Sequence, residues 1–346
     1  FWQGFGMKHR TFFWFVFPSV LAMLLFIAFP IISVVLQSLY VAHEQVIVSV
    51  QSCGPFGCTE STKIDTDATA ALRAAQPLGR WAGLTTYLDR GHLAVSEVAA
   101  EWQAAGSTGA FLGRLINLPF YKAMFFTLSY TFIVTPLTLI FGFAIAVAVN
   151  SAARALRGPL IFFTLLPMIV TPLVGSLILF WMIDARGILG AALQWAAGDP
   201  DLSVKASTPL TWIMLMVYGV WHAAPFAFIV YYAGLQTVNK ETLEAAVIDG
   251  ASRWERIRYV VLPHLLPLTT FIALIQLMDN FRVFEPIVSF SAQAHATSLS
   301  WAIYNDLGGE TRQLSSAAAT SVLTIIGVAI LLSPVLVRTW RDFSRK

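Results

Sequence analysis

Long apolar blocks dominate the chain, and polar residues gather in the stretches between them. Six blocks have membrane-spanning length, and they cover roughly residues 12–40, 123–149, 159–183, 209–234, 267–290 and 317–337. A helix needs roughly 20 apolar residues to cross a bilayer core of about 30 Å. The blocks also lack the short alternating segments of a transmembrane barrel. The pattern therefore predicts an all-α membrane protein with six transmembrane helices.

The composition agrees with this pattern. Hydrophobic residues make up 57% of the 346 positions and charged residues 12%, whereas a soluble domain is about a quarter charged. The first block follows Lys8, His9 and Arg10, as the apolar part of a signal peptide would. It is too long for one, and no small-residue cleavage site follows Tyr40. We expect this block to be a retained transmembrane helix.

The distribution of Lys and Arg predicts the orientation in the membrane. Six spans put both termini on one side, together with the basic residues Lys8, Arg10, Arg154, Arg157, Lys240, Arg253, Arg256, Arg258, Arg338, Arg341, Arg345 and Lys346. The short loops of the other side hold only Arg186, Lys205 and Arg312. By the positive-inside rule, the termini are expected in the cytoplasm.

Three regions follow from this topology: residues 1–40 with the first span, an extracytoplasmic segment 41–122, and a core of five spans at 123–346. Within 41–122, a short helix is expected around Leu93–Ala105, where Val95, Val98 and Trp102 have the spacing of a packed face. The length allows a small subdomain with a modest core.

The same segment contains both cysteines, Cys53 and Cys58, in the sequence Cys-Gly-Pro-Phe-Gly-Cys. A Gly-Pro turn can bring two sulfurs together, and an oxidising compartment would let them form a disulfide. Two unpaired thiols are the alternative. A metal site is not expected, because no histidine nearby completes a ligand set.

Prolines occur inside several spans, at Pro136, Pro167, Pro172 and Pro225. Each frees a backbone carbonyl, which neighbouring helices or cavity water can satisfy. They either kink helices for packing or shape a pathway that opens and closes.

The loop between the fourth and fifth spans, residues 239–263, predicts two short helices. Asn239 suits an N-cap, Gly250 can end the first helix in the left-handed conformation, and Ser252 with Glu255 has the spacing of a capping box. Pro263 is expected to prevent simple continuation of the second helix. The helix pair could pack on its own spans or insert into a groove of a soluble partner.

The residues of this loop closely resemble the EAA loop of binding-protein-dependent ABC importer permeases. The matching positions are Glu244, Ala245, Ala246, Asp249, Gly250, Ile257, Leu262 and Pro263. The resemblance implies that these residues contact a cytoplasmic ATPase subunit. Ile257 stands where this subfamily usually has Phe.

Further stretches resemble the maltose-type sugar permeases: Phe17-Pro18 through Phe29-Pro30, Trp81 through Tyr87, and Asp279 through Glu285. Two features depart from that family. The Gly-Gly-Gly-Pro turn after the fifth span is absent, and about 40 residues before Trp81 look like an insertion.

Two polar patches within spans are candidates for a substrate pathway. Charges at the centre of a span cost about 2.5–3.5 kcal/mol each on insertion scales, so Asp279, Arg282 and Glu285 should face the protein interior. A structural ion-pair network among them is the alternative to a pathway role. The pathway hypothesis names Tyr218, Trp221 and His222 on the fourth span and Gln276, Asp279 and Asn280 on the fifth.

The chain has no nucleotide-binding G-x-x-x-x-G-K-[ST] sequence, and neither H-E-x-x-H nor G-x-S-x-G occurs. We expect no catalytic residue and no cofactor in this chain, with ATP–Mg bound by a partner ATPase. The resemblance implies a second permease, two ATPase subunits, an extracytoplasmic binding protein and a carbohydrate substrate, with membrane lipid around the spans and no nucleic acid.

The expected location is the bacterial inner membrane, and the expected function is that of a permease subunit in an ATP-driven carbohydrate importer. An ion-coupled secondary transporter of a small polar solute is the main alternative. A membrane enzyme and a sensory subunit are weaker alternatives.

Overall fold

The computed structural model describes residues 9–43, 46–54, 57–309 and 312–344. Residues 1–111 and 303–323 form one compact unit, and residues 112–302 and 324–346 form the other. Each unit is described by itself. Of the charges used for the orientation, Lys8, Arg345 and Lys346 lie outside the described residues.

The first unit begins with an apolar helix that is nearly all exposed. It consists of α1 (His9–Met23), a π-helical turn η1 (Leu24–Ala28) and α2 (Phe29–Ser38), and Phe12–Ser38 is long and apolar enough to cross a membrane. A helix that exposes large apolar side chains all round suits a lipid environment. The apolar helix that the sequence predicts here is therefore present, with the length that a membrane span needs.

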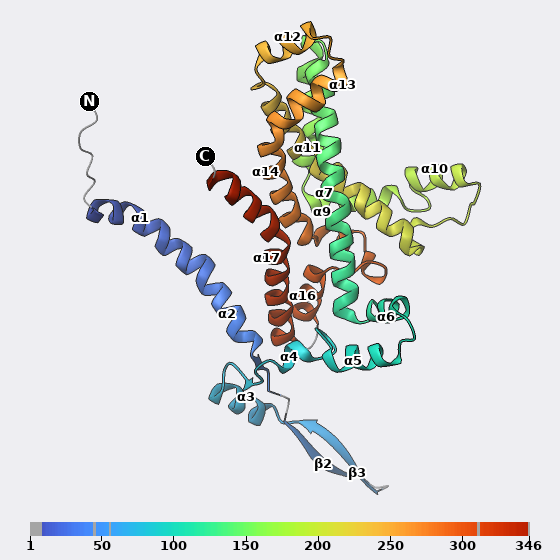
Figure 1. Ribbon diagram of the computed structural model, residues 1–346. Helices are drawn as coiled ribbons and strands as arrows, with labels where there is room; N and C mark the ends of the chain where they lie inside the picture. The colour runs from blue at the N-terminus through green and yellow to red at the C-terminus, as the bar shows by residue number, and fades with distance from the viewer. Residues whose placement is uncertain (1–8, 44–45, 55–56, 310–311, 345–346) are drawn as a thin grey trace. The chain divides into compact units, whose positions relative to one another are not determined.

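The segment after α2 begins and ends with two short strands that pair with each other. Strand β1 (Tyr40–Val41) pairs with β4 (Arg80–Trp81), and the rings of Tyr40 and Trp81 meet edge to face with centroids 5.1 Å apart. Between these strands lie an antiparallel hairpin and a helix: β2 (Ile47–Gly54), β3 (Gly57–Ile64) and α3 (Thr66–Ala75). The hairpin is drawn in blue in Figure 1.

Short helices follow in the same unit. They are α4 (Thr85–Leu88), α5 (Val95–Ala104) and the start of α6 (Thr108–Leu115). The helix expected around Leu93–Ala105 is thus confirmed. The expectation that one face of this helix is packed is wrong in part, because Val95 is 50% exposed and Trp102 is 58% exposed. The Trp102 ring meets the ring of Phe111 edge to face, with centroids 5.0 Å apart.

The second unit contains the membrane-length helices of the core. They are α7 (Pro119–Ser151), α8 (Arg154–Ile169), α9 (Pro172–Met182), α11 (Thr208–Leu235), α14 (Leu262–Phe281) and the end of α17 (Leu314–Ser344). Helix α7 packs against α11 and α14 along its length (Figure 1). Shorter elements connect them: α10 (Ile188–Ala197), η2 (Val204–Ala206), α12 (Lys240–Ile248), α13 (Arg253–Arg256), η3 (Ile257–Val261), α15 (Glu285–Ser289), η4 (Ala292–Ala294) and the start of α16 (Leu299–Gly308).

Close contact between α7 and α11 depends on small residues. A side chain at Gly142 would overlap Ala227, and one at Gly219 would overlap the hydroxyl of Tyr130. Small residues let transmembrane backbones approach each other where no hydrophobic effect drives them together. Around this seam lie two buried apolar clusters, one near Phe126 and Leu215 and the other near Phe228 and Leu265.

The structure corrects the third predicted span, residues 159–183. Helices α8 and α9 are bent by 94° at the break between Ile169 and Pro172. Proline disfavours the helical conformation in the residue before it, and Thr171 is extended, with φ −61° and ψ 146°. Pro172 therefore starts a new helix and does not kink a continuous one, unlike Pro136, Pro167 and Pro225, which lie inside helices.

Five helices among the described residues are long and apolar enough to span a membrane, and the bent α8–α9 pair would be a sixth. The sequence prediction of a helical membrane protein is confirmed at this level. The fifth predicted span was drawn too far, however, because α14 ends at Phe281 and not near residue 290.

Candidate functional site

Helices α12 and α13 form a capped elbow that stands at one end of the second unit (Figure 1). The Asn239 side chain accepts a hydrogen bond from the amide of Glu241 at 2.8 Å. Ser252 and Glu255 form the predicted capping box, with reciprocal bonds of 2.7 and 3.3 Å. Gly250 has φ +80° and joins the two helices. The caps and the turn that the sequence predicts in this loop are confirmed.

The elbow exposes most of its side chains. Glu244, Ala245, Asp249 and Gly250 are exposed, whereas Ala246 is half-buried. Ile248 is 85% exposed and Trp254 is 66% exposed. Of the other residues matched to the EAA loop, Ile257 is half-buried, and Leu262 and Pro263 are exposed.

The second helix continues past Pro263, although not as a regular α-helix. Helix α13 continues through the π-helical turn η3 into α14, and Arg253–Phe281 forms one helix of 29 residues. Proline is tolerated where the hydrogen bond it cannot make is already absent, and Pro263 lies in the first turn after the wider turn η3. The elbow is therefore joined to a long apolar helix without a break.

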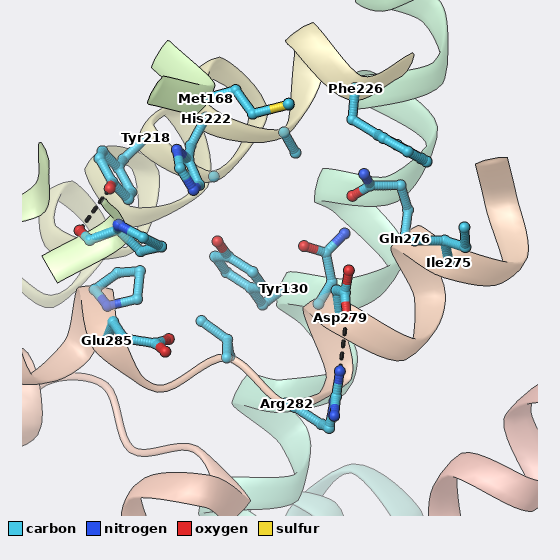
Figure 2. A pocket seen from close by; sticks show the side chains of 16 residues that line it. Tyr130, Met168, Tyr218, His222, Phe226, Ile275, Gln276, Asp279, Arg282 and Glu285 are labelled. Carbon is cyan, nitrogen blue, oxygen red and sulfur yellow. Dashed lines mark hydrogen bonds and ion pairs between the residues drawn. The ribbon is translucent and has the colours of Figure 1, made fainter. Parts of the chain in front are cut away.

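A cavity of about 620 Å³ lies in the middle of the second unit (Figure 2). Its wall comes from α7, the α8–α9 break, α11, α14 and the start of α15. The lining residues are Tyr130, Met168, Pro172, Tyr218, Gly219, His222, Ala223, Phe226, Ile275, Gln276, Asp279, Asn280, Arg282, Val283, Glu285 and Pro286.

Side chains from α11 satisfy backbone groups at the α8–α9 break. The last carbonyls of a helix have no partner within it. His222 Nδ1 lies 3.0 Å from the carbonyl oxygen of Pro167, near the end of α8. The Tyr218 hydroxyl donates at 2.7 Å to the carbonyl oxygen of Pro172, the first residue of α9, which also accepts from the Ser176 hydroxyl. Non-helical backbone at membrane depth is tolerated where it is buried in protein or lines a cavity. The break between α8 and α9 is therefore stabilised by side chains of α11 and forms part of the cavity wall.

Helix α14 supplies the polar groups on the facing wall. Gln276 and Asn280 are buried, and the Asn280 amide donates to the Thr135 hydroxyl on α7 at 3.0 Å. Arg282 pairs with Asp279 at 2.7 Å. Helix α14 ends at Phe281 and α15 starts at Glu285, so Arg282 and Glu285 do not lie on one continuous helix. Val283 lines the cavity from the connection between the two helices.

The structure brings together five of the six residues named for the pathway: Tyr218, His222, Gln276, Asp279 and Asn280. The sixth, Trp221, is 45% exposed and does not line the cavity. Sequence reasoning missed Tyr130, Met168 and Phe226 as lining residues. Tyr130 carried a signal, since it is a polar aromatic residue inside the second apolar block, but only packing decides which way it faces.

The disulfide between Cys53 and Cys58 stays a prediction. The register of β2 and β3 sets the two residues directly opposite each other, which is the backbone arrangement that the prediction needs. Their side chains, and Pro55 and Phe56 of the predicted turn, lie outside the described part of the structure.

These features define a polytopic helical membrane protein with a polar, aromatic-lined cavity inside its core. Residues 108–341 match the family described as the binding-protein-dependent transport system inner membrane component, and the chain belongs to this family. It is thus a multi-pass inner-membrane permease.

Curated relatives are transporter permeases. The trehalose/maltose transport system permease protein MalF of Thermococcus litoralis is 27% identical over 229 residues, which cover 62% of this chain and 73% of MalF. The sn-glycerol-3-phosphate transport system permease protein UgpA of Rhizobium meliloti is 30% identical over 205 residues, or 57% of this chain and 69% of UgpA.

A solved structure shares the fold over nearly the whole chain. It is a chain of a bacterial ABC transporter involved in the import of the acidic polysaccharide alginate, with a TM-score of 0.66 and 18% identity, covering 96% of this chain and 98% of that one. At this identity the likeness concerns the fold alone.

Proposed function

We propose that this chain is the permease subunit of an ATP-driven carbohydrate importer and forms half of the translocation path. The observation that carries the proposal is the continuous helix from the exposed elbow into the cavity wall. Residues 253–281 connect the surface of α13 to Gln276 and Asn280 without a break. Membership of a binding-protein-dependent transport family supplies the transport context.

In this proposal the elbow is the contact surface for a separate ATPase. The small residues Ala245 and Gly250 would allow close approach, and exposed Ile248 would enter an apolar groove of the partner. The caps at Asn239 and Ser252 keep both helices formed, so the elbow can transmit a displacement as a rigid body. ATP–Mg would be bound by that partner and not by this chain.

The orientation proposed from the charges puts the elbow and both termini in the cytoplasm. The hairpin-containing segment 41–122 would then lie outside, where an extracytoplasmic binding protein delivers substrate. The predicted regions 1–40, 41–122 and 123–346 follow from this topology. A second permease would supply the other half of the path, and two ATPases would bind the two elbows.

The cavity is proposed as part of the sugar path. A sugar has apolar faces and a rim of hydroxyl groups, and the cavity offers aromatic rings beside amide and carboxylate groups. The rings of Tyr218 and His222 are stacked, with centroids 5.8 Å apart and an interplanar angle of 7°. Buried polar groups that already have partners keep such a wall rigid.

The test uses the assembled transporter, purified through this chain and reconstituted in vesicles with its binding protein. Uptake of labelled sugar should require ATP on the side of the elbow and should stop when ATP is depleted. Uptake that persists without ATP while a membrane potential is held would contradict the proposal and favour an ion-coupled transporter.

The Gly250→Pro variant tests the coupling elbow in the same vesicles. Proline fixes φ near −65° and removes the amide hydrogen, whereas Gly250 has φ +80° and donates to Val247. ATP hydrolysis should continue while uptake is lost. Gly250→Asn is the matched control, because Asn tolerates positive φ. Normal uptake by Gly250→Pro would show that the elbow transmits nothing.

A further inference from the structure

The cavity wall has used up several of its hydrogen-bond donors. A carbonyl oxygen only accepts, so the Tyr218 hydroxyl and His222 Nδ1 must be the donors to Pro172 and Pro167. In a neutral imidazole, Nε2 of His222 then remains as an acceptor. One amide hydrogen of Asn280 is also committed, to Thr135. Donors also remain on the Tyr130 hydroxyl, the Gln276 amide and the other N–H groups of Arg282. The wall therefore suits a ligand of hydroxyl groups, which both donate and accept.

The charges of the wall point the same way. Arg282 is the only Lys or Arg among the described residues that line the cavity, and its guanidinium is paired with Asp279 at 2.7 Å. Glu285 makes no ion pair with any described residue, and it lies across the cavity from Gln276 and Asp279 (Figure 2). With His222 neutral, the lining carries one net negative charge, contributed by Glu285.

We propose that the cavity selects sugars without an anionic group, and that Glu285 is the residue that determines this selectivity. Its carboxylate accepts a hydrogen bond from a sugar hydroxyl or an ammonium group and repels a phosphate or a uronate. Charges a few ångströms apart at a protein surface interact more strongly than in bulk water. The inference rests on the proposed function and narrows its substrate class.

Family membership alone does not decide this point. The names of the relatives include both a trehalose/maltose and a sn-glycerol-3-phosphate system, and the chain with the same fold comes from an importer of an acidic polysaccharide. The negative charge at the cavity wall favours a neutral sugar over a sugar phosphate or an acidic polysaccharide.

The experiment measures direct binding to the assembled transporter in nanodiscs, without the binding protein, so that the latter's own specificity does not enter. Saturation-transfer NMR compares neutral disaccharides with their 6-phosphates and uronates, and includes maltose, trehalose and their phosphates. The wild type should give signals with neutral members of the pairs and weak or no signals with anionic ones. Glu285→Gln should reduce the preference for the neutral member by about tenfold.

Asp201→Asn is the matched control, because Asp201 is an exposed carboxylate between α10 and η2 and does not line the cavity. It should leave the preference unchanged. Equal binding of neutral and anionic members by the wild type, or an unchanged preference in Glu285→Gln, would overturn the selectivity proposal while ATP-dependent uptake stands. Failure of every neutral sugar to bind would also overturn it, and loss of ATP-dependent sugar uptake itself would overturn the proposed function.

Discussion

The Asn280 side-chain amide donates a hydrogen bond to the Thr135 hydroxyl at 3.0 Å, and both groups are buried. The bond joins α14 to α7 beside the cavity. Removing one of these two groups would leave the other buried without its hydrogen-bond partner, which lowers the free energy of unfolding.

This relationship predicts a coupled effect on stability. Asn280→Ala and Thr135→Val should each destabilise the protein, and the double variant should lose less than the sum of the two. The coupling free energy is expected at about 0.6 kcal/mol, the average for hydrogen bonds between transmembrane helices. Denaturant unfolding in mixed micelles would measure this double-mutant cycle, and strictly additive losses would contradict the bond.

The seam between α7 and α11 predicts a strong difference between two glycines. Gly142→Ala places a methyl group against Ala227, and overpacking of this kind costs about 1–3 kcal/mol. Gly158 lies inside α8 with nothing near its added methyl group, so Gly158→Ala should stabilise the helix by about 0.5–1 kcal/mol. Thermal unfolding of the two variants compares them directly, and similar effects at both positions would rule out the close seam.

The capping box predicts where local opening begins. Ser252→Ala removes the acceptor for the Glu255 amide, and loss of such a cap costs about 1 kcal/mol. Amide hydrogen exchange in residues 253–257 should become faster, while exchange in α11 stays the same. Ser252→Thr should keep wild-type protection because its hydroxyl can replace the cap. Uniformly faster exchange would instead indicate a global loss of stability.

A pH dependence is expected at the ion pair between Asp184 and Lys205, which are 2.8 Å apart. The hydrogen bond from Lys205 lowers the pKa of Asp184 below its ordinary value of 3.8. The carboxylate is thus favoured in the folded state, and its contribution to stability is fully present above pH 3.8 and is lost as the pH falls through the lowered pKa.

Asp184→Asn should remove this part of the acid dependence and should have a small effect on stability, since exposed ion pairs contribute little. Unfolding curves at several acidic pH values compare the variant with wild type. The separate ion pair between Arg282 and Asp279 should be unaffected by this substitution. An unchanged acid dependence in Asp184→Asn would show that the pair does not form in solution.

Local sequence patterns were enough for the membrane spans and the elbow. Apolar length alone predicts the spans at 123–149 and 209–234, which form the helices α7 and α11, because a bilayer imposes a minimum length and little else. Asn239, Gly250, Ser252 and Glu255 act within a few residues of themselves, so caps and the left-handed turn could be predicted from spacing.

Two prolines show where local rules stop. Pro172 breaks a predicted span, whereas Pro263 leaves its helix unbroken. The rule that proline disrupts helices is the same at both sites. The outcome differs because a π-helical turn precedes Pro263, while His222 and Tyr218 from another helix satisfy the carbonyls freed near Pro172.

The sequence by itself determined that this chain is helical, membrane-embedded and capped at its elbow, because these properties depend on hydrophobic length and on neighbours along the chain. Only the tertiary structure decided that Tyr130, Glu285 and the α8–α9 break share one cavity, and that Trp221 faces away from it. Those facts depend on how helices distant in sequence rotate and pack against one another, and no local pattern of residues encodes that rotation.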